Sequence, residues 1–287
     1  MKLFGFAEAA YYCSSFTAEP GDAEGSLDSF IRNNLGSQRI IREGSPLFVA
    51  YRSCALRESE RLLFLAISQY RRCLDLLIPS SSPWSHVTMY YGCFFAAKSI
   101  LGMFGSVIFN NFVVDVHRSS PSSQELVKRR IGNRVGDVQT TYTGSHKRFW
   151  DIFYRAVSPI RPFVVPSVSF AFSPISNNPT WLIDRRNEIN YDAYEALHHA
   201  DIFSTQFSAK SFPASLPGML GTQYALLESF IEIASTFARQ LSLRTDALKS
   251  FSSSGSISSI VRDSIFYQKI PSLVSKSKKV TIMRALK

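Results

Sequence analysis

The stretch that decides the fold is residues 82–105, SPWSHVTMYYGCFFAAKSILGMFG. Ser82 is a capping residue, Pro83 suits the first helical position and Gly105 favours a helix end, so the stretch predicts one helix. Apolar side chains surround this helix almost completely, which is typical of a central core helix or of a membrane span. Because polar residues such as Lys98 interrupt it and no second such stretch occurs, we expect a core helix and no membrane partner.

Further helices are expected on both sides of this stretch. Residues 52–77 and 223–243 have the spacing of amphipathic helices, and Pro79 ends the first of them. Another helix is expected to begin at Asn178, a capping residue followed by proline. The small side chain of Gly92 leaves room for a neighbouring helix on the central one. The two predicted apolar faces consist of Leu56, Leu63, Ile67, Tyr70, Leu74 and Leu77, and of Leu226, Leu227, Phe230, Ile231, Ala234 and Phe237.

Residues 106–178 read as a long insertion of mixed structure. Apolar runs at 111–116 and 162–172 predict short strands, and the aromatic segment 146–154 predicts a helix. The expected fold class is therefore mainly α, a helical bundle with a long mixed insertion. Three parts are expected along the chain: a peripheral N-terminal segment, 1–50; the helical bundle with its insertion, 51–245; and a Ser-rich linker with a basic tail, 246–287.

The chain of 287 residues has 32 Lys and Arg against 22 Asp and Glu, a formal net charge of +10. Apolar residues make up 45% of it, which is enough for a buried core and excludes a disordered tail. Positive charge gathers in residues 118–155, with eight basic and three acidic residues, and in residues 207–287, with eleven and four. This distribution indicates a polyanion partner or simply keeps an aromatic-rich protein in solution, and charge alone leaves both open.

Several catalytic and cofactor patterns are absent from the sequence, including the Walker-type phosphate loop, GxGxxG, HExxH and GxSxG. The four cysteines are far apart and the apolar N-terminal run stops at Glu8, so we expect no disulfide scaffold, no signal peptide and a cytoplasmic location. Adjacent His198 and His199 point about 100° apart on a helix and cannot hold one metal together. Neither a metal nor a cofactor is expected.

Residues 181–191, WLIDRRNEINY, form the segment that points most directly to chemistry. On a helix, Arg185 and Arg186 share a side with Leu182 and Ile189. If the two apolar side chains pack into the core, at least one arginine is drawn toward the interior or toward the edge of a cleft. A guanidinium held there needs partners, because an unpaired buried charge is costly.

Neutral hydrogen-bonding groups accompany these arginines. Asn187, Asn190 and Tyr191 lie within one turn of them, and a fixed guanidinium with amide and phenol groups suits a phosphodiester. The alternative is a surface helix in which the arginines pair with nearby carboxylates. The available carboxylates are Asp184, Glu188 and Asp192.

Two segments together resemble the HEPN superfamily. Residues 90–101, YYGCFFAAKSIL, are similar to its first core helix, which often reads Tyr-Tyr-x-x-Phe-x-Ala-Ala-x-x-Leu-Leu. A later helix of the superfamily carries Arg-x(4–6)-His, and one branch reads Arg-Asn-x-Ala-Asp-Tyr there. Arg186 through Tyr191 resembles that branch in spacing. The resemblance covers residues 52–105 and 179–243 and skips the insertion.

The resemblance implies a compact helical bundle that commonly dimerises so that the motif helices of two copies meet. Many members are metal-independent ribonucleases that act as toxins or in antiviral defence. By position, Arg186 would hold the scissile phosphate and Asn187 would be the polar residue that follows it. Tyr191 stands where the motif has histidine. Because an ordinary phenol has a pKa of about 10, Tyr191 would act as an acid or hydrogen-bond donor.

The sequence thus predicts a HEPN-like, cytoplasmic RNA-binding protein with endoribonuclease activity and a catalytic set of Arg186, Asn187 and Tyr191. A homodimer or a partner protein is expected as well. The alternative is a non-catalytic helical module that dimerises or binds a partner enzyme, with Arg186 in an ion pair. The residues expected to bind RNA outside the catalytic set are Arg185, Asn190, Lys128, Arg129, Arg130, Lys147 and Arg148.

Overall fold

The chain is mainly helical and carries one small antiparallel sheet, as the predicted fold class requires. The structure, a computed structural model, describes residues 5–14, 27–35, 40–109, 111–120 and 123–241. The predicted Ser-rich linker and basic tail lie outside these residues.

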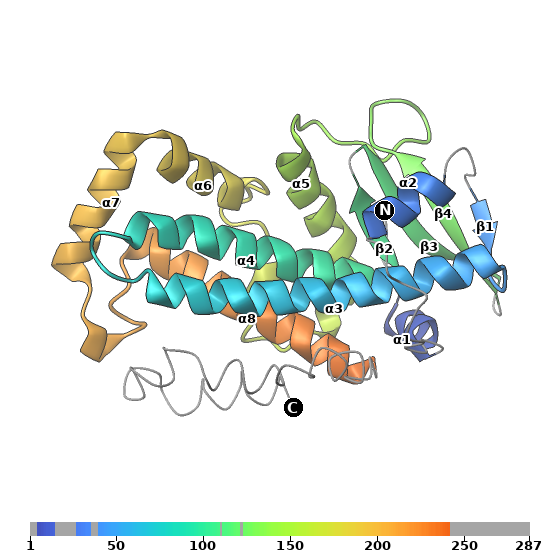
Figure 1. The fold of residues 1–287 in the computed structure, drawn as a ribbon, viewed down its shortest axis with the longest axis horizontal. Helices are drawn as coiled ribbons and strands as arrows, with labels where there is room; N and C mark the ends of the chain where they lie inside the picture. The colour runs from blue at the N-terminus through green and yellow to red at the C-terminus, as the bar shows by residue number, and fades with distance from the viewer. Residues whose placement is uncertain (1–4, 15–26, 36–39, 110, 121–122, 242–287) are drawn as a thin grey trace.

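Three long helices run lengthwise and form the frame of the molecule (Figure 1). They are α3 (Pro46–Asp75), α4 (Ser82–Met103) and α8 (Gly218–Gln240). Helix α4 packs against both of the others and contributes many of the fully buried side chains, so it is the central core helix that the sequence predicts. Within the described residues, no helix has both the length and the apolar character that crossing a membrane requires.

The ends of α4 fall close to their predicted positions, with one correction at the start. Ser82 is already helical, so the predicted cap is wrong by one residue, and Ser81 takes the N-cap position without a side-chain capping bond. The Ser82 hydroxyl donates instead to the carbonyl oxygen of Pro79 at 3.3 Å. Gly105 follows the C-cap residue Phe104 with a φ of +71°, which glycine adopts without strain and which ends the helix.

Close packing at Gly92 determines how α4 meets its neighbours. A Cβ placed on Gly92 would lie 2.5 Å from Cδ1 of Leu227 on α8 and 3.3 Å from Cβ of Gln69 on α3. Both neighbours therefore occupy the space that a larger side chain would need. The predicted apolar faces of residues 52–77 and 223–243 are buried as well, which confirms that the three helices share one core.

Helix α3 begins earlier than the sequence pattern predicts. The Ser45 hydroxyl accepts a hydrogen bond from the backbone N–H of Phe48 at 3.2 Å and so caps a helix that starts at Pro46. The predicted boundary between residues 50 and 51 thus falls inside α3. Before it lie α1 (Phe6–Ser14) and α2 (Leu27–Asn34), which bury Tyr12 and Ile31 in the main core.

The first part of the insertion supplies three strands of the sheet, and residues 40–42, before α3, supply the fourth. Its strands, in the order β1–β4–β3–β2, are Ile40–Arg42, Ser123–Arg130, Phe112–Ser120 and Ser106–Phe109, and every pairing is antiparallel. The predicted strand at 111–116 lies in β3, and the predicted aromatic helix is α5 (Ser145–Val157).

The predicted strand at 162–172 is wrong. Its two ends lie in the 3-10 helices η1 (Ser158–Phe163) and η2 (Ser169–Phe172), and residues 164–168 between them form a turn. Pro162 and Pro166 lack the backbone N–H that a strand donates to its neighbour, which accounts for the difference.

The last helices before α8 are α6 (Trp181–Tyr191) and α7 (Ala193–Gln206), followed by the short turn η3 (Ala209–Ser211). Both helices contact α4, and Figure 1 shows α5 and α6 along the same side of α4. The start of α6 is a correction, because Asn178 does not cap the helix. Its Oδ1 accepts from the backbone N–H of Thr180 at 2.9 Å and closes a turn before the helix.

Candidate nucleic-acid interface around Arg186

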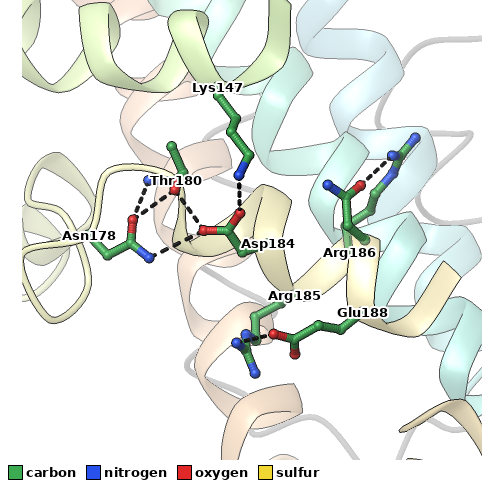
Figure 2. Close-up of polar contacts among 8 residues, drawn as sticks. Lys147, Asn178, Thr180, Asp184, Arg185, Arg186 and Glu188 are labelled. Atoms are coloured by element: carbon green, nitrogen blue, oxygen red, sulfur yellow. Dashed lines mark hydrogen bonds and ion pairs between the residues drawn. The ribbon is translucent and has the colours of Figure 1, made fainter. Parts of the chain in front are cut away.

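Helix α6 holds Arg186 against α4. Leu182 and Ile189 are buried, so the side of α6 that they define faces the core. Arg185 and Arg186 are half-buried beside them, as the helical spacing predicts. The two arginines leave α6 in different directions (Figure 2), and their surroundings differ accordingly.

The Arg186 guanidinium lies among aromatic rings and has no carboxylate partner in the described part of the chain. Its Nη2 donates to the hydroxyl of Tyr91 at 2.7 Å, and its Nη1 donates to Oδ1 of Asn187 at 2.8 Å. The guanidinium carbon lies 5.5 Å from the ring centre of Tyr91, 5.8 Å from that of Tyr90 and 5.9 Å from that of Tyr191. These contacts fix the cation and leave its charge without an opposing ion.

The electrostatic setting keeps Arg186 charged. Burial opposes the charge, but the hydrogen bond with Tyr91 and the neighbouring phenol groups outweigh burial and raise the pKa of Arg186. Its Nε is buried without a hydrogen-bond partner in the described structure.

Arg185 matches the alternative that the sequence left open. Its Nη2 forms an ion pair with Glu188 on the same helix, and its Nη1 lies 3.5 Å from Sδ of Met219. The contacts of the Arg185 guanidinium are therefore made within the protein, with Glu188 and Met219. Asn190 is half-buried with no side-chain hydrogen bond in the described residues, and Tyr191 is 75% exposed.

A histidine that the sequence reasoning missed lies beside this site. His146, at the start of α5, places its Nδ1 2.5 Å from the hydroxyl of Tyr90 and stacks on Phe94 with ring centres 4.7 Å apart. The rings of His146 and Tyr91 are nearly perpendicular, with their centres 6.4 Å apart. From the sequence alone, His146 is only one residue of a predicted aromatic helix. A linear pattern does not show that this helix, α5, packs on α4 next to α6.

An ion pair joins α5 to α6. Nζ of Lys147 lies 2.8 Å from Oδ1 of Asp184, and Figure 2 shows the lysine reaching down from α5 to the carboxylate. Asp184 also accepts hydrogen bonds from the hydroxyl of Thr180 at 2.6 Å and from the amide of Asn178 at 3.3 Å. Burial acts to raise the pKa of Asp184, but these hydrogen bonds and the charge of Lys147 together lower it.

Strand β4, which carries three of the predicted RNA contacts, and helix α6 lie on opposite sides of α5 (Figure 1). Nη2 of Arg129 pairs with the buried carboxylate of Asp115 at 2.5 Å, and Nζ of Lys128 donates to the carbonyl of Leu35 at 2.7 Å. Arg130 is exposed at the end of the strand. These three predicted RNA contacts therefore do not gather with the motif residues.

Arg148, the remaining predicted RNA contact, ties α5 to the adjacent loops. Its Nε donates to the carbonyl of Tyr142 at 3.2 Å, and its Nη1 donates to Oδ1 of Asn111 at 2.7 Å. The structure thus brings together Arg186, Asn187 and Tyr191, with Lys147 nearby through its carboxylate partner.

Two other histidines form a second cluster, between α4 and α7. The ring of His86 on α4 lies 4.8 Å from that of His199 on α7, centre to centre, with the two rings tilted by 57°. Nδ1 of His86 is hydrogen-bonded to the amide oxygen of Gln223. Burial lowers the pKa of His86 to about 4. In the described part of the chain, no three His, Cys, Asp or Glu residues gather as a metal site would require.

Comparison with known proteins adds no assignment. No protein-family model, no curated protein and no solved structure matches this chain. The case for a function therefore depends on the geometry around Arg186.

Proposed function

We propose that this chain is a HEPN-like RNA-binding protein that acts as a metal-independent endoribonuclease in a toxin–antitoxin or antiviral defence system. The observation that carries the proposal is the state of Arg186. It is held inward on α4 by Tyr91 and Asn187, and no described carboxylate neutralises it. A cation held in this way is prepared for an anionic guest.

Donor geometry supports a phosphate as that guest. A guanidinium has five N–H groups, of which Tyr91 and Asn187 occupy one on each terminal nitrogen of Arg186. One N–H on each terminal nitrogen therefore remains for two oxygens of a phosphodiester. The exposed ring of Tyr191 lies next to the guanidinium and offers a surface for stacking a base.

The reaction class is transfer of the phosphoryl group to the ribose 2′-oxygen, which needs no metal. Arg186 would stabilise the negative charge that develops on the phosphate, and Asn187 would hold Arg186 in place. Tyr191 would give its phenolic proton to the departing 5′-oxygen. The four cysteines are buried free thiols, which supports the cytoplasm as the location.

The test is RNA cleavage by the purified full chain in the presence of EDTA. A 3′-labelled single-stranded RNA containing all four bases should yield fragments, and the same sequence with 2′-O-methyl riboses should remain intact. Arg186→Ala should abolish cleavage. Arg32→Ala removes the same charge from an exposed position on α2 and should cleave normally. Intact RNA after incubation with the wild-type chain would overturn the nuclease proposal.

A second candidate function is the non-catalytic interaction module, and one observation favours it. Tyr191, Tyr194 and Leu197 are 75%, 73% and 68% exposed at the junction of α6 and α7. Large exposed apolar side chains that lie close together are typical of a protein-binding surface. Such a surface suits a second copy of this chain or a partner protein.

Sedimentation separates this candidate from the first. A dimer that is lost in Leu197→Asp, together with intact RNA in the cleavage assay, would favour the interaction module. A monomeric wild-type chain at micromolar concentration would remove the homodimer from both candidates.

A further inference from the structure

His146 and Arg186 approach the same pair of tyrosines on α4 from two different helices. His146 comes from α5 and is hydrogen-bonded to Tyr90, and Arg186 comes from α6 and is hydrogen-bonded to Tyr91. The rings of Tyr90 and Tyr91 are in contact edge to face, with centres 5.2 Å apart. An imidazole and an unneutralised cation therefore lie next to each other although the motif helix itself contains no histidine.

The groups around His146 leave its imidazole neutral. It is half-buried, and burial is the main cause of a lowered pKa at His146, to which the positive charges of Arg186 and Lys98 add. Lys98, one turn further along α4, lies over the ring of Phe94 at 5.5 Å. The next residue on α5, Lys147, is occupied by Asp184 of α6. The neighbouring phenols of Tyr90 and Tyr91 complete the titratable groups that face the ring.

We propose that His146 is the general base of this site and replaces, from the inserted helix α5, the histidine that the motif helix lacks. The inference rests on the proposed ribonuclease function and assigns a residue to it. Its geometric basis is the Tyr90 hydrogen bond at Nδ1, which leaves Nε2 without a partner in the described structure. With the proton on Nδ1, Nε2 carries the lone pair that a base uses.

The step balances with the residues present. Nε2 of His146 takes the proton of the ribose 2′-hydroxyl, and the 2′-oxygen forms a bond to phosphorus. The bond from phosphorus to the 5′-oxygen breaks, and that oxygen takes the phenolic proton of Tyr191. Arg186 binds the phosphate oxygens throughout. The products are a 2′,3′-cyclic phosphate and a free 5′-hydroxyl, and solvent later returns the protons.

Two neighbours act as positioning residues for the imidazole. The hydroxyl of Tyr90 holds Nδ1 at 2.5 Å, so Nε2 is the ring nitrogen left for the ribose 2′-hydroxyl. The pair between Lys147 and Asp184 holds the start of α5 against α6. Because His146 and Lys147 are adjacent, this ion pair also fixes the backbone from which the imidazole projects.

The experiment measures cleavage of the labelled RNA by the full-length wild type, His146→Ala, His146→Phe and His198→Gln. General base catalysis contributes about 100-fold or more, so both His146 variants should lose about that factor in kcat. His146→Phe keeps a ring to stack on Phe94, so its loss would not come from lost packing. His198→Gln changes an exposed histidine on α7 and should cleave like the wild type.

Two further readouts distinguish a base from a structural residue. RNA affinity, measured by fluorescence anisotropy, should stay within about twofold of the wild type, because the phosphate contact at Arg186 remains. Added imidazole should restore part of the cleavage by His146→Ala, and the acidic limb of the pH–rate profile should disappear in both His146 variants.

Each outcome decides a separate claim. Wild-type cleavage with unchanged rates in His146→Ala would overturn this inference and leave the proposed ribonuclease function standing. Lost cleavage together with lost affinity, without rescue by imidazole, would make His146 a structural residue and also overturn the inference. A wild-type chain that binds RNA but leaves it intact would overturn both.

Discussion

Tyr91 and Arg186 lie 95 positions apart in the sequence, and a hydrogen bond of 2.7 Å joins the phenol oxygen to the guanidinium. This bond connects the central helix α4 to the motif helix α6. The partner of Arg186 is a neutral phenol, so the arginine is fixed without being neutralised. The following predictions depend on this arrangement and on the packing that supports it.

The first prediction concerns the charge of Arg186. Replacing it with Ala should weaken RNA binding by about 1–3 kcal/mol. The slope of log affinity against log salt concentration should also become less steep by about one, because one counterion fewer is released from the RNA. Anisotropy titrations at several salt concentrations measure both quantities. Arg32→Ala, an equal change in net charge on α2, should leave the slope as it is. An affinity that is the same at low and high salt in the wild type would contradict the electrostatic basis of the site.

The second prediction concerns the hydroxyl of Tyr91. Tyr91→Phe keeps the ring beneath Arg186 and removes its hydrogen bond, which is worth about 0.5–1.5 kcal/mol in typical cases. RNA affinity should therefore fall by about 3- to 10-fold with little change in melting temperature. The matched control is Tyr194→Phe, which removes a hydroxyl from an exposed ring on α7. Equal affinities for both variants would show that Tyr91 does not position Arg186.

The third prediction concerns Asp184. Asp184→Asn should weaken its contacts with Lys147 and Thr180 and lower the free energy of unfolding by about 1–2 kcal/mol at pH 7. Because the folded state lowers the pKa of Asp184, its contribution is present above the ordinary carboxyl range and is lost as the pH falls below about 4. Urea unfolding at pH 7 and pH 3 measures the difference. A variant as stable as the wild type at pH 7 would contradict the role of this contact.

The fourth prediction concerns the buried His86. Its pKa is about 4 in the folded state, mainly because of burial, and about 6.5 in an unfolded chain. The unfolded state then binds more protons between these values, so the stability that His86 provides is full above pH 6.5 and declines as the pH falls to about 4. The decline should be on the order of 3 kcal/mol.

Urea unfolding at pH 7.0, 6.0 and 5.0 checks this prediction before most carboxylates titrate. The groups that face His86 are His199 from α7, Arg185 from α6 and Gln223 from α8. The fall in stability toward pH 5 should be smaller in His86→Gln than in the wild type, and His198→Gln should keep the wild-type slope. If the free energy of unfolding of His86→Gln depended on pH as steeply as that of the wild type, groups other than His86 would cause the pH dependence.

The fifth prediction concerns the contact at Gly92. Gly92→Val should lower the free energy of unfolding by about 1–3 kcal/mol, because the new side chain would overlap Leu227 and Gln69. Gly218→Val is the matched control, since a Cβ at that position meets nothing within 4 Å. Thermal or urea unfolding of the two variants compares them directly, and equal stabilities would contradict the close approach of α4 to α8.

Periodic patterns were sufficient to predict the frame of the fold. The core helix at residues 82–105 and the apolar faces around it follow from spacing alone, because burial along a helix repeats with its turn. Two local features could not be predicted from this spacing. The start of α3 depends on the capping hydroxyl of Ser45, and the segment 162–172 is apolar but interrupted by proline.

The candidate site could be predicted only in part for a related reason. The inward position of Arg186 follows from its spacing to Leu182 and Ile189 on one helix. His146 could not be placed there, because its contact with Tyr90 spans 56 positions and depends on how α5 folds back. Linear spacing carries no information about such contacts, whether the residue is a histidine, a lysine or a carboxylate.

The link between Lys147 and Asp184 has a practical consequence for protein engineering. Residues 106–178 read as an insertion in the sequence, and a shortened variant would replace them with a brief loop. Such a deletion would also remove α5, which holds the motif helix through this ion pair and contributes Phe149, Trp150 and Phe153 to the main core. A minimal version of this protein must therefore retain α5, and the sheet can be trimmed only where it does not carry that helix.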